Sequence, residues 1–415
     1  MQRLNLFIMD ISSPESTSGV DRHIEMLLYG MKNTPNIHIH WIHFLYNSSL
    51  IIYKEEKYEY YTKTTFPLPV NYRDIISEKF WMRKYNKHIF HLIEKMFLDK
   101  ENCIIHLHTL NLIDLAQLIK EHVRCKIITH LHCIPWKNYF NTDRYRFNSL
   151  YQMVCLSTEN EINSHDFLTN NCEYESYTCA DHIITGTQCG VDFLVNVMGI
   201  SPNKISIVNN GMFDHAKEGM KNNIKDTFPS IQCLFVGNLS ESKGLRFVLD
   251  ALRIVQRNGF QVVLKIAGFA TPVTSSRILN EYSDLKICLL GVQSFEQLAE
   301  LYKKCDIGII ASLQEQWSFV AVEMAMFSLP IITTAVDGLD EIFTDNINAL
   351  KVDLYFDSLT GLTVDVAMMA EKLSLLIEDN DLRAKLSRNV RLLFEAKLDV
   401  QNMIKKTVAI YQELT

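Results

Sequence analysis

The segment that decides the fold is Ala311–Glu323, ASLQEQWSFVAVE, which directly follows the apolar run Asp306–Ile310. Such a short apolar run is typical of a buried parallel strand, and a helix is predicted to begin near Phe319. Glu315 then lies at the carboxyl end of the strand, and Glu323 lies about one turn into the helix. In open α/β sheets this edge is where ligands bind, and the first amides of the helix can hold a diphosphate. Alternatively, the two glutamates only complement the dipole of the helix.

Short apolar runs alternate with helical patterns along the chain, which indicates βαβ units and parallel sheets. In the first half, strands are predicted at Leu4–Met9, Ile37–Leu45, Cys103–His108, Lys126–Leu131, Gln152–Leu156 and His182–Thr185, with helices at Gly19–Met31 and Leu112–His122. The pattern restarts near Pro202 and continues with strands at Ile231–Val236, Gln261–Ala267, Lys286–Leu290, Asp306–Ile310 and Pro330–Thr333. At 415 residues the chain exceeds one comfortable core. We therefore predict an α/β protein with Rossmann-like domains at 1–205 and 206–395, and a helix in 396–415 that packs back on the first.

The composition is that of an ordinary soluble enzyme, with 47% apolar and 21% charged residues. A net charge of −7 without a domain-wide basic excess argues against a nucleic-acid partner. The ten cysteines form no CxxC pair, which favours a reducing compartment over a disulfide framework. The amino-terminal MQRLNLFIMD resembles a first strand more than a secretory signal, and no apolar run is long enough for a membrane span. We expect a cytoplasmic protein.

Four histidines end two predicted strands of the first half, at His106, His108, His130 and His132. His130, two residues before His132, is expected to point to the opposite side, so that only one of them faces the ligand edge. His108 is the better candidate on the other strand. With Cys133 nearby these residues could bind zinc, but no second spaced pair completes a site, so we expect no metal.

The spacing of Glu315 and Glu323, with seven residues between them, resembles the E-x7-E block of the family-four retaining glycosyltransferases. The resemblance continues through Leu329–Thr334, Gly338 and Glu341-Ile342, and upstream through the loop Phe235–Gly244, Ile266–Gly268, Gly291-Val292 and Tyr302–Asp306. Weaker matches are Ser18–Val20, Ala180–Ile184 and Val208–Gly211. The resemblance implies the GT-B fold, in which two Rossmann-like, doubly wound domains face a central cleft.

The resemblance also implies roles for individual residues. Lys243 would pair with the donor diphosphate, as suits a point charge on leaving-group oxygens. Glu315 would lie near the donor sugar, Glu323 would accept hydrogen bonds from the ribose hydroxyls, and His132 would contact the sugar or the developing charge. The implied catalytic residues are His132 and Glu315, and the implied donor-binding residues are Gly19, Gly237, Asn238, Lys243, Gly291, Ser318, Phe319, Val320 and Glu323.

Three positions depart from the family pattern. Asn238 stands where the family commonly has arginine, so half of the cationic clamp is missing or supplied elsewhere. Gln316-Trp317-Ser318 replaces the usual Gly-Phe-Gly, which restricts how closely the backbone can approach a sugar. The loop Ser16–Asp21 has the single glycine Gly19 in place of the usual pair. These departures bear more on the donor sugar than on the reaction type.

The implied function is a retaining, metal-independent hexosyltransferase without a cofactor. It would move a sugar from a nucleoside-diphosphate sugar, as co-substrate, to a glycan, lipid-linked or peptide acceptor. A sugar-nucleotide epimerase of the same fold and a non-catalytic partner subunit remain alternatives. No GxGxxG follows either first strand, which argues against a dinucleotide enzyme. The basic and aromatic segment Lys79–Met96 is read as an exposed amphipathic helix, with peripheral contact at the inner membrane face as the alternative.

Overall fold

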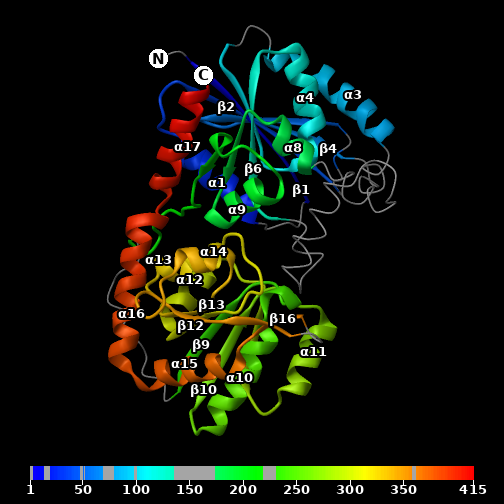
Figure 1. The fold of residues 1–415 in the computed structure, drawn as a ribbon. Coiled ribbons are helices and arrows are strands. Elements are labelled where there is room, and N and C mark those ends of the chain that lie inside the picture. The colour runs from blue at the N-terminus through cyan, green and yellow to red at the C-terminus, as the bar shows by residue number, and fades with distance from the viewer. Residues whose placement is uncertain are drawn as a thin grey trace. The chain divides into compact units, whose positions relative to one another are not determined.

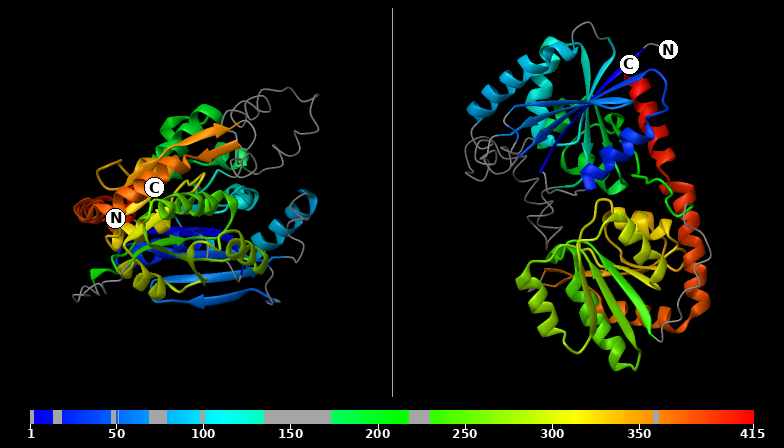
Figure 2. Two further views of the ribbon diagram at one scale, coloured as in Figure 1. Left: turned by 90° about the horizontal axis from the view of Figure 1, so that it is seen from below. Right: turned by 180° about the vertical axis from the view of Figure 1, so that it is seen from behind.

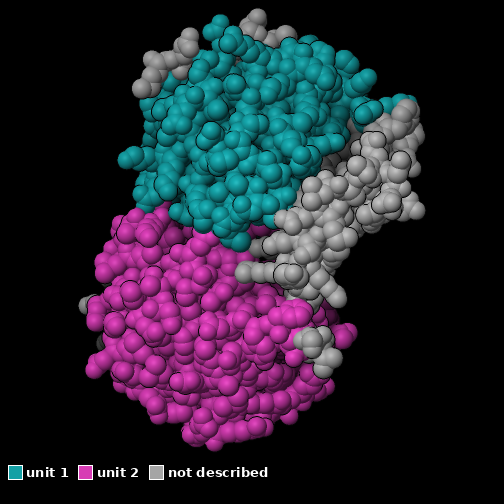
Figure 3. Space-filling model, viewed as in Figure 1, with its two compact units in different colours: residues 1–132, 148–209, 400–415 teal, residues 133–147, 210–399 magenta. Residues whose placement is uncertain are grey.

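The computed structural model describes residues 3–13, 19–46, 50, 52–68, 79–97, 101–134, 173–217, 230–357 and 361–415. The chain divides into two compact units, coloured separately in Figure 3. Unit 1 comprises residues 1–132, 148–209 and 400–415, and unit 2 comprises residues 133–147 and 210–399. The predicted strand Gln152–Leu156 lies outside the described residues. Each unit contains a largely parallel sheet with helices, so the predicted α/β class is confirmed (Figure 1).

Unit 1 is built on an eight-stranded sheet of order β3-β4-β2-β1-β5-β6-β7-β8. Its strands are β1 (Leu4–Ser12), β2 (Ile37–Leu45), β3 (Lys54–Lys57), β4 (Tyr61–Pro67), β5 (Cys103–Leu107), β6 (Cys125–Leu131), β7 (His182–Thr185) and β8 (Ile205–Ile207). All neighbours pair in parallel except the β3–β4 hairpin, which the sequence analysis missed because Tyr61–Pro67 mixes polar and apolar residues. The run at Ile205 belongs to this sheet, where β8 pairs with β7, and does not open the second domain.

Helices cover unit 1 on two sides. They are α1 (Gly19–Gly30), α3 (Lys79–Phe97), α4 (Ile113–His122), α8 (Glu173–Cys179), α9 (Gln188–Asp192) and α17 (Val400–Leu414), with short turns η1 (Leu110–Leu112), η2 (Phe193–Val197) and η3 (Pro202–Lys204). Buried side chains of α3 and α4, such as Ile89, Ile93 and Ile119, form one core with Phe7 and Leu107 of the sheet. The last helix, α17, packs beside α1, as the right view of Figure 2 shows.

Unit 2 contains a six-stranded parallel sheet of order β11-β10-β9-β12-β13-β14. Its strands are β9 (Ile231–Val236), β10 (Val262–Ala267), β11 (Lys286–Gly291), β12 (Ile307–Ile310), β13 (Ile331–Thr334) and β14 (Leu350–Val352), with a separate hairpin of β15 (Leu354–Asp357) and β16 (Gly361–Val364). Its helices are α10 (Leu245–Arg257), α11 (Pro272–Glu281), α12 (Phe295–Lys304), α13 (Phe319–Met326), α14 (Asp337–Ile342), α15 (Val366–Glu378) and α16 (Asn380–Leu393), with η5 (Glu241–Lys243) and η6 (Phe394–Leu398). The second-half strands predicted from apolar runs are therefore present within a residue or two.

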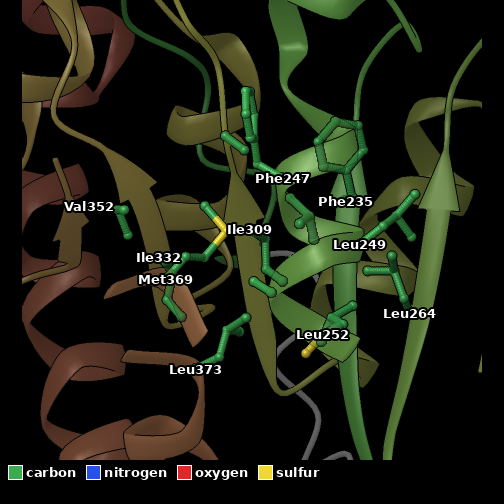
Figure 4. Close-up of a cluster of buried hydrophobic side chains, with 14 of the residues drawn as sticks. Phe235, Phe247, Leu249, Leu252, Leu264, Ile309, Ile332, Val352, Met369 and Leu373 are labelled. Carbon is green, nitrogen blue, oxygen red and sulfur yellow. The ribbon is translucent and has the colours of Figure 1, made fainter. Parts of the chain in front are cut away.

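Two apolar clusters hold the helices of unit 2 to its sheet. In the first, α10 and α15 bury residues such as Leu252 and Leu373 against Phe235, Leu264 and Ile309 (Figure 4). In the second, α12, α13 and α14 pack with α16 and η6. Its buried residues include Leu298, Tyr302, Phe319, Met324, Leu339, Val390 and Phe394. At roughly 1.5–3 kcal/mol for each large apolar side chain removed from water, these clusters fix the strand ends that carry the site.

Among the described residues, no helix combines the length and the apolar character that a membrane crossing needs.

Candidate functional site

The strand order of unit 2 identifies where a ligand would bind. β9, the first strand of the unit, lies between β10 and β12, so the chain winds in opposite directions from this point. The register pairs Phe235 with Ile309, which brings the carboxyl ends of β9 and β12 together. In open α/β sheets the crevice outside such a switch point is the usual ligand site. The two loops that meet there are 237–244 and 311–318, the segments that the sequence analysis singled out.

Gly244 allows the first loop to approach the second. It has φ +68°, and a Cβ at this position would lie 2.0 Å from the carbonyl oxygen of Ala311. A larger residue at this position is therefore disfavoured for two reasons: the backbone is left-handed, and a Cβ would clash with Ala311. The amide of Leu313 also donates to the carbonyl of Ser242 at 2.8 Å. These contacts hold Lys243, the residue before Gly244, beside the end of β12.

Lys243 and Glu315, both predicted site residues, meet directly. The ammonium of Lys243 forms an ion pair with Oε2 of Glu315, and the hydroxyl of Ser312 donates to the same oxygen at 3.2 Å. The side chain of Lys243 is 33% exposed and that of Glu315 is 13% exposed. A ligand arriving at this edge can therefore reach the ammonium, and its negative charge would compete with the carboxylate.

The backbone of Glu315 is held from the other side by α14. The amide of Gly338 donates to the carbonyl of Glu315 at 2.9 Å, and a Cβ on Gly338 would lie 2.2 Å from the carbonyl oxygen of Gln316. The amide of Glu315 donates to Oδ2 of Asp337 at 3.4 Å. Gly338 is thus needed for close approach of α14, and the loop around Glu315 is set by neighbours on both sides.

The start of α13 completes this edge of the sheet. Ser318 is the N-cap, and its hydroxyl accepts from the amide of Ala321 at 3.2 Å. The amides of Phe319 and Val320, in the first turn, have no carbonyl one turn before them within the helix. Together with the positive end of the helix dipole, they could donate to an anion, and the binding of a diphosphate here stays a prediction.

Glu323 lies deeper than the resemblance implies. Its exposed fraction is 0%, and it accepts a hydrogen bond from the hydroxyl of Tyr302 on α12 at 2.5 Å. The structure therefore buries this residue of α13 against α12, beside residues of the second apolar cluster such as Tyr302. Ribose binding by Glu323 stays a prediction, and the geometry adds a structural role that the sequence analysis did not foresee.

Three glycines lie where three neighbouring strands of the sheet end. Gly237, Gly268 and Gly291 follow or close β9, β10 and β11, and all have positive φ. A Cβ on Gly268 would lie 1.8 Å from the carbonyl oxygen of Gly237, and the amide of Gly268 donates to the carbonyl of Gly291 at 2.8 Å. The predicted residues Gly237 and Gly291 thus belong to one packed edge. Asn238, also predicted, directly follows Gly237 in this loop.

In unit 1 the structure brings together histidines from two His-Leu-His segments, residues 106–108 and 130–132, and from α1. His106 and His108 of β5 lie beside His130 and His132 of β6, with ring centroids 4.0 Å apart for the stacked pair His130–His132. Nδ1 of His108 is 2.9 Å from Nε2 of His132. His23 of α1 lies 4.5 Å from His130 between ring centroids.

Two expectations about these histidines are wrong. His130 and His132 do not point to opposite sides, because side chains two residues apart on a strand share a face. A second spaced pair is also present in space, since His106 and His108 lie on the neighbouring strand. Burial, and after it the charges of neighbouring histidines, lowers the pKa of His108 and of His130 well below its ordinary value. Burial likewise lowers the pKa of His106 to about 3, so these imidazoles are neutral.

Other polar residues of unit 1 could not be selected from the sequence. Asp10 ends the apolar part of β1 and is fully buried, where Oδ1 accepts from the indole of Trp41 at 2.5 Å and lies 3.0 Å from Nδ1 of His43. The only sign of Asp10 in the sequence is that it is a polar residue at the end of an apolar run. Gly19, a predicted donor-binding residue, begins α1 and is exposed, while the preceding residues 14–18 lie outside the described part of the chain.

The comparisons with known proteins point to one family. Residues 220–393 match the family model described as glycosyl transferases group 1. An uncharacterized glycosyltransferase of Methanocaldococcus jannaschii is 29% identical over 188 residues, covering 44% of this chain and 48% of that protein. The D-inositol 3-phosphate glycosyltransferase of Mycolicibacterium smegmatis is 28% identical over 185 residues, covering 42% of each. The chain thus spans about half the length of the curated relatives it matches.

Solved structures resemble the chain over its full length. A glycosyltransferase from Rickettsia africae has a TM-score of 0.71 at 15% identity, covering 100% of this chain and 99% of that one. Sucrose-phosphate synthase from Thermosynechococcus elongatus has a TM-score of 0.72 at 16% identity, covering 99% of each chain. At such identities the likeness shows the fold alone. The chain therefore has the GT-B fold, and its residues 220–393 match the family model of the glycosyl transferases group 1.

Proposed function

We propose that the protein is a retaining glycosyltransferase that moves a hexosyl group from a nucleoside-diphosphate sugar to a glycan, lipid-linked or peptide acceptor. The observation that carries the proposal is the Lys243–Glu315 ion pair at the switch point of unit 2, beside the start of α13. The fold neighbours include HepE of Anabaena, solved with UDP and glucose, with a TM-score of 0.68 at 12% identity over 99% of this chain and 100% of that one. That complex supports a nucleotide-sugar donor.

In the proposed reaction, the bond between the sugar carbon and the diphosphate oxygen breaks, a bond to the oxygen of an acceptor hydroxyl forms, and the proton of that hydroxyl passes to the departing diphosphate. Negative charge develops on the departing diphosphate, where the ammonium of Lys243 and the amides of Phe319 and Val320 would stabilise it without a metal ion. Donors fixed by the fold are effective because they need no reorganisation during the reaction. Glu315, displaced from Lys243 by the diphosphate, would remain beside the sugar.

Two exposed apolar side chains support a place for the nucleobase. Phe269 is 60% exposed and Val292 is 67% exposed, and they directly follow Gly268 and Gly291 at the same edge of the sheet. An aromatic ring at this position can stack on a base. Phe269→Ala should weaken nucleotide binding, whereas Val273→Ala, which changes a 79% exposed residue on α11, should not.

The role of His132 rests on the family resemblance. We propose that it contacts the donor sugar, and its hydrogen bond to His108 would fix the orientation of its ring. His132→Ala should then lower turnover with little change in nucleotide affinity. A parallel loss of both would point to a structural role in the histidine cluster.

The experiment that tests the function combines binding and turnover. The full chain is screened by thermal shift against UDP-, GDP- and ADP-sugars, and the stabilising donors are then assayed for transfer to acceptor panels. Stereochemistry of the product, read by NMR, tests retention. Release of the free or epimerised sugar without any acceptor would favour the epimerase alternative. Donor binding without turnover in every panel would favour a non-catalytic partner subunit.

A further inference from the structure

The structure assigns a transition-metal site of the zinc type to His106, His108 and His130 in unit 1. One ring nitrogen from each of these three residues lies within 4.8 Å of the other two. The exposed fractions of the residues are 0%, 4% and 3%, so the group is enclosed by the unit. This inference is independent of the proposed glycosyl transfer.

Unpartnered nitrogens support the assignment. Nε2 of His106, Nε2 of His108 and Nδ1 of His130 are buried and have no hydrogen-bond partner among the described residues. A buried polar atom without a partner costs about 1–3 kcal/mol, so three in adjoining side chains call for an explanation. A metal ion that accepts three lone pairs satisfies all of them at once.

Two of the three remaining ring nitrogens have the hydrogen-bond partners expected around a metal site. Nδ1 of His106 lies 2.7 Å from the hydroxyl of Tyr411, and Nδ1 of His108 lies 2.9 Å from Nε2 of His132. If each Nδ1 carries the proton and donates, then each Nε2 presents a lone pair. Histidines that bind metals are usually oriented by such a second hydrogen bond.

The architecture explains why these residues converge. Ile105 and Leu107 of β5 face the core under α3 and α4. Side chains alternate along a strand, so His106 and His108 face the opposite side of the sheet. β6 pairs in parallel with β5, which places His130 and His132 alongside His106 and His108. α1 and α17 contribute His23 and Tyr411 over this group.

The donor set favours one class of metal. Neutral imidazole is a ligand for zinc, copper and nickel, whereas magnesium and calcium require oxygen. Zinc–nitrogen bonds of about 2.0–2.1 Å imply nitrogens about 3.3 Å apart in a tetrahedral site. The rings would therefore close by about 1.5 Å or less from the separations here. His23, 1% exposed and also grouped with His130 and His132, is the candidate for the fourth position.

A metal held by these side chains would join β5, β6 and α1, with α17 attached through Tyr411. The expected role is structural, because a set of three or four buried nitrogens leaves little access for substrate. Binding should therefore raise the thermal stability of the protein in the absence of any nucleotide.

The test uses the full chain, stripped with a chelator and titrated with ZnCl₂ and separately with CoCl₂. We expect one equivalent of zinc by calorimetry, the visible bands of tetrahedral cobalt, and a higher Tm with metal. His108→Gln/His130→Gln should abolish all three signals. His122→Gln, on the exposed end of α4, and Cys133→Ser, which changes the exposed thiol next to His132 in the sequence, should retain them.

Tyr411→Phe keeps the ring and removes only the hydroxyl, so it serves if the double variant does not fold. It should weaken zinc binding by about 10- to 100-fold, the range for loss of an outer partner. Absence of stoichiometric zinc or cobalt binding by the unaltered chain would overturn the assignment. Unchanged binding in a folded His108→Gln/His130→Gln variant would overturn it equally.

Discussion

The ammonium of Lys243 is ion-paired with the carboxylate of Glu315, although the two residues are 72 positions apart in the chain. The pair forms because β9 and β12 are neighbours and because Gly244 lets the loop after β9 lie against Ala311. In the free protein each residue therefore neutralises the other. Under the proposed function, a donor diphosphate would compete with Glu315 for Lys243, and the pair would then be a determinant of donor affinity.

Substitutions of this pair should have opposite effects on nucleotide binding. Glu315→Gln frees the ammonium, so nucleoside diphosphates should bind more tightly while sugar transfer falls. Lys243→Met should weaken binding about tenfold or more, the value of one charge-assisted hydrogen bond. In the double variant the gain from Glu315→Gln should disappear. Calorimetric titration measures the affinities of the unaltered chain, the two single variants and the double variant. Lys286→Met, which changes an exposed lysine on β11, is the control. If Lys243→Met and Lys286→Met weaken nucleotide binding equally, Lys243 does not bind the diphosphate.

Gly244→Ala should destabilise unit 2 by more than its positive φ alone can explain. The cost of a left-handed backbone is roughly 1–2 kcal/mol, and the clash with Ala311 adds to it. Gly291 has the same φ of +68°, but a Cβ there would have no atom within 4 Å, so Gly291→Ala isolates the backbone cost. Urea unfolding of both variants gives the difference. If the two losses are equal, the close approach of the loops does not constrain this edge.

Tyr302→Phe should lower the free energy of unfolding by about 1–3 kcal/mol. It leaves the buried carboxylate of Glu323 without the hydroxyl that donates to it. Tyr282→Phe removes a similar bond to Asp250, which is only partly buried, and should cost less. Nucleotide affinity of Tyr302→Phe is measured in parallel. A loss of affinity without a loss of stability would show that Glu323 acts on the ligand and not on the fold.

The pair Asp214–Arg391 should make unit 2 sensitive to acid. Burial by itself raises the pKa of Asp214, but hydrogen bonds and charge from Arg391 and Lys217 outweigh it and leave the pKa below its ordinary value. The unfolded chain then takes up a proton at higher pH than the folded one. The stabilisation is complete above about pH 4 and is lost as pH falls through the folded pKa.

Asp214→Asn should therefore reduce the free energy of unfolding at neutral pH, on the order of 2 kcal/mol, because Arg391 loses a charged partner that is only 6% exposed. The difference from the unaltered chain should shrink below about pH 4. Asp284→Asn, which breaks the exposed pair with Arg253, should change little at either pH. Denaturation at several pH values checks the sign, and a difference that grows in acid would contradict it.

Local patterns in the sequence were enough for the elements that carry the candidate site. The runs Ile231–Val236 and Asp306–Ile310 predicted β9 and β12 because buried parallel strands are short and apolar on both faces. The same reasoning placed Glu315 after a strand and Ser318 before a helix. It failed for β4, whose polar residues lie near the edge of the sheet. It also put the domain boundary inside β8 (Ile205–Ile207), because an apolar run does not reveal which sheet it joins.

The sequence by itself therefore determined the α/β class, the match of residues 220–393 to a family model and the loops that carry the candidate donor site. Only the tertiary structure decided which side chains meet: Lys243 with Glu315, Glu323 with Tyr302, and His106 and His108 with His130. The physical reason is that strand and helix patterns depend on near neighbours along the chain. Contacts across a parallel sheet depend instead on strand order and register, which join residues far apart in sequence.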